Sequence, residues 1–360
     1  MKKRFMILLA LLLTLICVAA SAQEYYTLPE IREQAAAGWH ETYTDKYGRT
    51  IPVDLEIDVF GEDVAPVLKV GIAPYEKYRV KENNPFESDR SIEKSGGKRT
   101  FVVRLSGQKI DLDKAYGIDY ENDLTVREAY DYLNTLLAPL ELSIEDFEVE
   151  YPEGLDVISN VKKNTDEVIS PAFYVMEICH RMRGMPIFTH ASFSVKAQKN
   201  PIYAPKLIFN MRNTEEYNLN LSSLVEQEEV VTDIPLCSLQ TVIDNLKEKI
   251  EAGYIQGVVA LRFGYVLYND PNYKGSGSAF DADCYYAVPS WVITCVFSPD
   301  PRETMWDEEK LAKRIEEEGY QISDLQRCMV INAQTGEMLD YFGKKSQSDY
   351  QSFIPWDKVQ

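Results

Sequence analysis

Apolar and polar residues alternate strictly along residues 51–59 of the chain. A period of two places every second side chain on the same face of a strand, so the pattern predicts a half-buried strand with a polar, mostly acidic outer surface. The apolar face consists of Ile51, Val53, Leu55, Ile57 and Val59.

Four other stretches have the spacing of amphipathic helices. The first begins at Thr27, where Glu30 three residues later completes a capping box. Helices are also expected near residues 124–140 and, as a charged surface helix, at residues 307–319. The clearest is residues 239–250, whose apolar face consists of Leu239, Val242, Ile243, Leu246 and Ile250.

Short apolar runs separated by turn residues predict strands along the rest of the chain. Residues 171–195 contain two such runs around Arg183 and Gly184, which is typical of a long hairpin. A second hairpin is expected at residues 329–341, where Gly336 can adopt the positive φ that a tight turn requires. Strands and helices do not alternate regularly, so the expected fold class is α+β.

The expected architecture is a set of antiparallel β-sheets, each packed against one or two helices, in two or three domains. A chain of 360 residues exceeds what one hydrophobic core usually serves. The chain becomes polar near residue 165, which suggests a boundary. We therefore expect an N-terminal α+β domain at residues 23–165 and a second α+β region at residues 166–360, with a further division near residue 234.

The first 22 residues have the pattern of a secretory signal peptide. A basic start at residues 2–4 precedes an apolar run, and the small residues Ala20, Ser21 and Ala22 follow it. Cleavage is expected after Ala22, which would make the protein secreted or extracytoplasmic at the cell surface. The alternative is that the apolar run stays uncut and anchors the chain in a membrane.

The mature chain is strongly acidic. The net charge of the full sequence is -19, and removal of three positive charges with the signal peptide lowers it to about -22. Such a chain is repelled by phosphate backbones and by anionic membrane surfaces, which argues against a nucleic-acid partner. The 57 acidic residues also make neighbouring carboxylates common by chance, so such pairs do not by themselves indicate acid–base catalysis.

The chain has six cysteines, and Cys17 lies in the predicted signal peptide. The remaining five are interpreted as small buried apolar residues. An odd number cannot pair completely, and their neighbours are typical of strands. One disulfide between Cys295 and Cys328 is the alternative, because their strands are expected to be neighbours.

Motifs for catalysis, metal or cofactor binding are weak or missing in the sequence, so no cofactor is expected. The three histidines lack metal-ligand spacing, although His180 and His190 could face each other across the predicted hairpin. One stretch partly matches a calcium loop, but Lys274 stands where an oxygen ligand is needed. Its matching positions are Asp270, Asn272, Gly275 and Asp281.

Tyrosine is abundant, with 23 residues, and its flat ring and hydroxyl suit contacts with proteins or sugars. Adjacent strand residues face opposite ways, so either Tyr285 or Tyr286 is expected to point outward. Trp291 on the same predicted strand is expected to be its largest buried residue. The candidate recognition surface is Tyr265, Tyr268, Tyr285 and Tyr286.

Four motifs follow one another in the second half of the chain, which are Gly184-Met185-Pro186, Gly264-Tyr265, Pro289-Ser290-Trp291 and the Asn332 to Glu337 turn. In this order they resemble the YycH/YycI-type extracytoplasmic regulatory proteins and related PepSY-like modules, and the resemblance covers about residues 171–342. It implies a partner in the cell envelope of Gram-positive bacteria, such as a wall-sensing histidine kinase. Residues 23–165 have no counterpart in that family.

Together these features predict a non-catalytic exported protein that acts by binding. Its expected partner is an envelope protein such as a sensor kinase, or cell-wall polymer. The first alternative is a hydrolase that cleaves wall polymers through two carboxylates, which requires two buried carboxyl groups across an open cleft. The second alternative is a carrier of a small ligand or metal ion.

Overall fold

The structure is a computed structural model of the chain. It describes residues 24–73, 77–80, 97–101, 126–149, 155–161, 168–188, 207–221, 224–269, 285–297, 326–338 and 353–359. The predicted signal peptide, the calcium-like stretch and the charged helix at residues 307–319 lie outside these ranges. In the described part, no helix is both long and apolar enough to cross a bilayer.

One large sheet, here called the β15 sheet, has the strand order β13-β5-β16-β15-β4, and β17 also pairs with β16. Its pairs are antiparallel except for β15 with β4, which run parallel. The strands are β4 (Ile57–Val59), β5 (Pro66–Ile72), β13 (Val225–Asp233), β15 (Ile255–Asn269), β16 (Tyr285–Phe297) and β17 (Gln326–Asn332).

A second sheet, the β9 sheet, has the order β12-β11-β9-β8-β6, with β7 and β10 also paired to β9. All its pairs are antiparallel. The strands are β6 (Gly97–Phe101), β7 (Phe147–Val149), β8 (Leu155–Val161), β9 (Val168–Met182), β10 (Met185–Pro186), β11 (Leu207–Met211) and β12 (Tyr217–Asn220).

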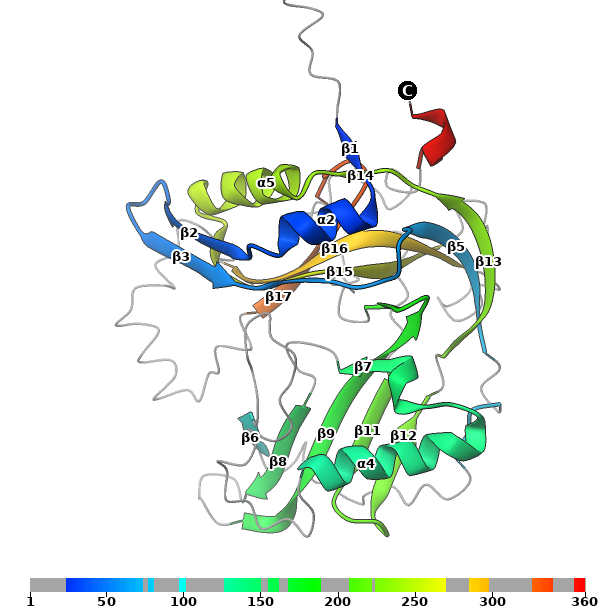
Figure 1. The fold of residues 1–360 in the computed structure, drawn as a ribbon. Coiled ribbons are helices and arrows are strands. Elements are labelled where there is room, and N and C mark those ends of the chain that lie inside the picture. Colours follow the sequence, from blue (N-terminus) through cyan, green and yellow to red (C-terminus); the bar gives the residue numbers. More distant parts are fainter. Residues whose placement is uncertain are drawn as a thin grey trace, which may run out of the picture.

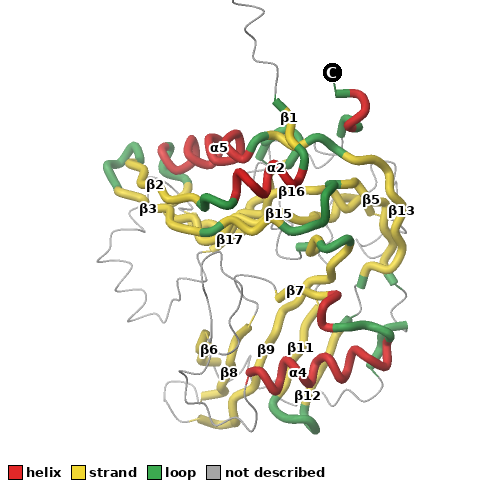
Figure 2. Tube along the Cα trace, in the orientation of Figure 1, coloured by secondary structure: helices red, strands yellow, loops and turns green. Residues whose placement is uncertain are grey.

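Helices cover one face of each sheet. In Figures 1 and 2, α2 (Leu28–Ala35) and α5 (Leu239–Glu251) lie over the β15 sheet, and α4 (Val126–Leu137) lies against the β9 sheet. The five apolar residues predicted for the buried face of α5 are all buried. The α+β class with antiparallel sheets packed on helices is therefore confirmed.

Short elements join these layers. The two-stranded pairs are β1 (Tyr25–Tyr26) with β14 (Leu236–Cys237), and β2 (Trp39–Thr44) with β3 (Thr50–Leu55). Single 3-10 turns are η2 (Ala138–Leu140), η3 (Ile144–Asp146) and η9 (Trp356–Lys358). The α2 capping box is present: the Glu30 carboxylate accepts from the Thr27 backbone N–H at 2.7 Å and lies 2.8 Å from its hydroxyl.

The two sheets do not follow one another along the chain. β4 and β5 precede residue 73 but share the β15 sheet with strands that follow residue 224, whereas the strands of the β9 sheet lie between residues 97 and 220. The boundary predicted at residue 165 falls between β8 and β9, which pair directly. The prediction of two consecutive units was wrong, because the long-range pairing of β5 with β13 and β16 leaves no local pattern.

The strand predicted at residues 51–59 is divided between two partners. β3 pairs with β2, and after Glu56 the chain continues as β4, which pairs with β15. Ile51, Val53, Leu55 and Ile57 are buried as the alternation predicts, and all belong to the core of the β15 sheet. The periodicity thus identified the buried face but not the change of partner.

Candidate functional site

Three of the four tyrosines predicted to form a recognition surface are fully buried. Tyr265, Tyr268 and Tyr285 each have 0% of their surface exposed, and the hydroxyl of Tyr265 donates to the Pro66 carbonyl at 3.0 Å. Tyr285 lies opposite Val70 of β5, within the sheet rather than at its margin. The predicted surface was therefore wrong at these three positions, which belong to the hydrophobic core of the β15 sheet.

Tyr286 is the outward-facing member of the tyrosine pair, as alternation along β16 requires. Its ring is half-buried, and its centroid lies 6.5 Å from that of Phe353 in the C-terminal segment. This segment, residues 353–359, ends in η9 and is drawn in red above the helix-bearing side of the β15 sheet in Figure 1. Tyr286 therefore packs both on the core of the β15 sheet and on Phe353 of the C-terminal segment.

The turn after β17 holds the same segment from another side. As predicted, it closes a hairpin: Gly336 has a φ of 72°, its N–H donates to the Asn332 carbonyl at 2.8 Å, and Ile331 bridges Met338. The side-chain oxygen of Asn332 accepts from the Gln334 and Thr335 N–H groups at 2.8 and 3.1 Å. The turn is thus fixed by its own first residue.

The side-chain amide of Gln334, at the centre of this turn, hydrogen-bonds to both backbone groups of Ile354. Its Nε2 donates to the Ile354 carbonyl at 2.7 Å, and its Oε1 accepts from the Ile354 N–H at 2.9 Å. The residue is only 2% exposed. Its amide therefore acts as a short strand partner for the C-terminal segment.

Two large side chains of residues 353–359 point outward. Ile354 is 50% exposed and Trp356 is 40% exposed, although both are large apolar residues. We call the surface formed by Tyr286, Phe353, Ile354 and Trp356 the C-terminal face. Of these residues only Tyr286 was predicted from the sequence. The signal for the rest was three large apolar residues close together near the C-terminus, Phe353, Ile354 and Trp356.

A second unusual arrangement is a group of charges between the two sheets, centred on Arg262 of β15. Arg262 is 6% exposed, and its Nε lies 3.5 Å from Oδ2 of Asp58 on β4. Its Nη2 lies 3.8 Å from Oε1 of Glu148 on β7, and Glu148 also pairs with Arg181 on β9. Two cations and two carboxylates therefore alternate across the contact between the sheets.

Aromatic rings enclose the two guanidinium groups. The Phe60 ring centroid lies 5.0 Å from the guanidinium carbon of Arg262 and 5.8 Å from that of Arg181. The Phe188 centroid lies 5.1 Å from the Arg262 guanidinium carbon. These distances favour cation–π attraction, and a buried charge needs such partners to offset its loss of hydration. A charged residue inside the apolar β15 stretch was the sequence signal for this cluster, and it was missed.

Asp58, one of the two carboxylates of the cluster, has a perturbed pKa. Burial raises the pKa of Asp58 to about 6; Arg262 opposes this shift, while Glu148 and Glu56 add to it. A carboxyl group with such a pKa can donate a proton near neutral pH. However, Asp58 and Glu148 both face the same guanidinium group, which favours an ion network that joins the sheets.

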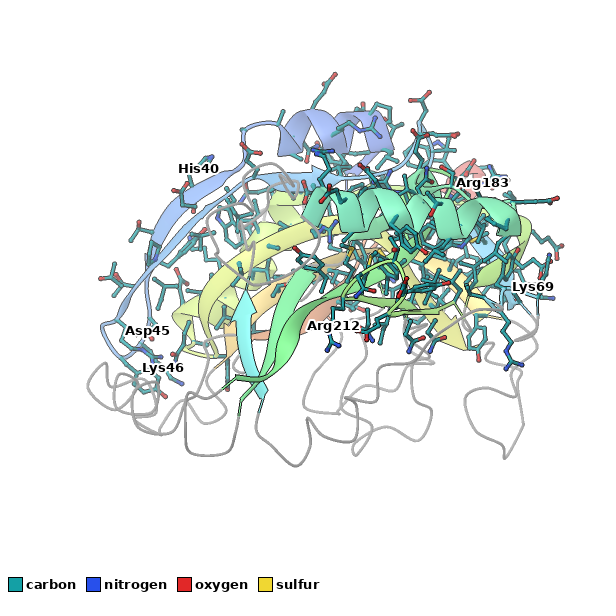
Figure 3. All side chains as sticks on the ribbon, turned by 90° about the horizontal axis from the view of Figure 1, so that it is seen from below. His40, Asp45, Lys46, Lys69, Arg183 and Arg212 are labelled. Carbon is teal, nitrogen blue, oxygen red and sulfur yellow. The ribbon has the colours of Figure 1, made fainter. Side chains whose placement is uncertain are left out.

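The described histidines occupy different environments. His40 on β2 lies at the surface, labelled in Figure 3, with its Nδ1 2.5 Å from Oδ1 of Asp54. His180 on β9 packs against Phe147 with ring centroids 5.7 Å apart, and burial lowers its pKa to about 4. His190 lies outside the described residues. Within the described ranges, His, Cys, Asp and Glu residues form no group of three that could hold a metal ion.

The cysteines that can be placed are buried thiols. Cys179, Cys237 and Cys295 are reduced, and burial raises the pKa of Cys237 to about 12. β16 and β17 are neighbours as expected, but Cys295 lies opposite Arg327 and Cys328 lies opposite Thr294. The alternative of a Cys295–Cys328 disulfide was therefore wrong, because the two residues are not opposite one another in the strand register and Cys295 is a thiol.

Comparison with known proteins assigns no family to the chain. No protein-family description and no curated protein matches the chain. Among solved structures, one match is the crystal structure of an uncharacterized protein from Eubacterium rectale ATCC 33656. That match has a TM-score of 0.49 and 13% sequence identity, and it covers 80% of this chain and 90% of that chain.

Proposed function

We propose that the protein is exported and acts by binding a partner in the cell envelope through the C-terminal face, without catalysing a reaction. The observation that supports this is the outward display of Ile354 and Trp356 on a segment held in place by Gln334 and Tyr286. Large exposed apolar side chains that lie close together often mark a binding surface. The outward position of Tyr286 extends the same surface.

The anchoring of the segment makes it suited to recognition. Trp and Tyr are enriched among the residues that dominate binding energies, since they bury a large area with few rotatable bonds. A segment already ordered by the Gln334 amide loses less conformational freedom when a partner binds. The C-terminal face is therefore a prepared surface rather than a loose chain end.

The resemblance of residues 171–342 to YycH/YycI-type proteins suggests the class of partner. On that basis the partner is an extracytoplasmic part of an envelope sensor, and the protein regulates it. Cell-wall polymer is the alternative ligand, because exposed Trp and Tyr rings also stack on sugars. The net charge of the chain argues against anionic polymers in either case.

The test compares three full-length variants of the mature protein. Trp356→Ser and Ile354→Ser change the C-terminal face, and Val64→Ser is the matched control because Val64 is 46% exposed elsewhere on the surface. Each protein is mixed with detergent-solubilised membranes of its own host, and in a separate arm with purified wall material. We expect one bound species to be lost with both face variants and retained with the control.

The outcome of each arm has a defined meaning. Loss of a membrane protein supports the sensor partner, and loss of sedimentation with wall material supports the polymer. Equal binding by all three variants, at unchanged melting temperatures, would reject the C-terminal face as the binding surface.

A further inference from the structure

We propose that the turn from Asn332 to Glu337, together with Tyr286, is a binding site for an extended peptide. In this structure the chain's own C-terminal segment occupies the site, and a free extended peptide takes its place. This inference goes beyond the proposed function, because a peptide at this site displaces the C-terminal segment instead of binding to its exposed face.

The contact made by Gln334 is directed at a peptide backbone. The amide bonds both the N–H and the carbonyl of Ile354, at 2.9 and 2.7 Å, whereas the Ile354 side chain is 50% exposed. A contact of this kind does not depend on the side chain of the bound residue. In proteins that bind an extended peptide along a sheet edge, hydrogen bonds to the peptide backbone likewise provide affinity, and pockets for its side chains provide selectivity.

Selectivity comes from the neighbouring position. Phe353 precedes the clamped residue, and its ring lies on Tyr286 with centroids 6.5 Å apart. An aromatic side chain on the amino-terminal side of the clamped residue is therefore the feature that the site recognises. The ligand class is an extended peptide with an aromatic residue followed by any residue other than proline.

The receiving side of the site is rigidly built. The Gly336 carbonyl accepts from Nδ2 of Asn245 on α5 at 2.6 Å, and the Ala333 carbonyl accepts from the Cys237 N–H at 2.9 Å. These bonds tie the turn to α5 and β14. A Cβ on Gly336 would lie 2.6 Å from a methyl carbon of Thr241, so the turn packs closely on the helix. The turn is thus held independently of the C-terminal segment that it binds.

The occupant, in contrast, leaves two of its large apolar side chains, Ile354 and Trp356, 50% and 40% exposed. A tethered segment competes with a free peptide through its high effective concentration. A free peptide should therefore bind weakly to the wild-type chain and more tightly when the tethered segment is weakened.

The test uses the full-length mature chain and a fluorescein-labelled peptide with the sequence Phe-Ile-Pro-Trp-Asp-Lys, which corresponds to residues 353–358. The double variant Phe353→Ala, Ile354→Pro removes the ring on Tyr286 and the N–H bound by Gln334. By fluorescence anisotropy, we expect this variant to bind the peptide about tenfold or more tightly than the wild type does. Addition of Gln334→Ala should abolish the gain, and Gln240→Ala on the exposed side of α5 should not.

Hydrogen exchange in the otherwise wild-type chain provides a second measurement. Gln334→Ala should accelerate exchange of the Ile354 N–H but leave the Asn332 N–H, which donates to the Glu337 carbonyl at 2.9 Å, unchanged. Equal peptide binding by the wild type and the double variant would overturn the proposal, as would a gain that survives Gln334→Ala. If peptide binding fails while Trp356→Ser still abolishes partner capture, the peptide site is rejected and the C-terminal face stands.

Discussion

The Asp58→Asn variant should change how the stability of the protein depends on pH. Asp58 faces Arg262, Glu148 and Glu56, and burial raises its pKa from 3.8 to about 6. A carboxyl group with a raised pKa binds its proton more tightly in the folded state than in the unfolded state. The contribution of this tighter proton binding to the free energy of unfolding is therefore present at low pH and is lost as the pH rises from about 4 to about 6.

The size of the effect follows from the difference between the two pKa values. The shift of about 2 units corresponds to about 3 kcal/mol at 1.4 kcal/mol per unit. The Asp58 side chain is 31% exposed, so solvent screening reduces this to about 2 kcal/mol. The amide of the Asp58→Asn variant cannot ionise, so the variant should gain about this much stability relative to the wild type between about pH 4 and pH 7.5.

Urea unfolding of both proteins across this pH range measures the difference. The exposed Asp63→Asn variant controls for the loss of one surface carboxylate. The comparison between proteins at each pH cancels the contributions of other titrating groups. A stability difference that stays constant with pH would refute the assignment of a raised pKa to Asp58.

Three further changes test other parts of the structure. His180→Gln should make the protein less sensitive to acid between about pH 6.5 and 4. The pKa of His180 is lowered to about 4, so its neutral form contributes stability that is lost as the pH falls through this window. An unchanged dependence of urea unfolding on pH would contradict this. Trp291 is 1% exposed and packs on Phe263, so Trp291→Ala should cost about 3 to 5 kcal/mol and lower the melting temperature markedly, while Trp356→Ala should melt close to the wild type. Gly336→Ala should destabilise by about 1 to 2 kcal/mol, because its φ is 72° and the added methyl group would meet Thr241; a calorimetric scan that matches the wild type would count against this.

Local patterns in the sequence determined the elements and their buried faces. The capping box at Thr27, the apolar stripe of α5 and the positive φ at Gly336 were all predicted, because each depends on residues close together in the chain. The same reasoning placed Trp291 in the core. Alternation also predicted that either Tyr285 or Tyr286 points outward, and only the structure shows that it is Tyr286.

Only the tertiary structure decided which distant segments share a sheet and what covers their surfaces. The pairing of β5 with β13, the enclosure of Arg262 between Asp58 and Glu148, and the bond from Gln334 to Ile354 all join residues far apart in sequence. Such contacts depend on the three-dimensional path of the chain, which residue spacing does not encode. Buried tyrosines and displayed ones look alike in the sequence, since the difference between them is set by the segments that pack on them.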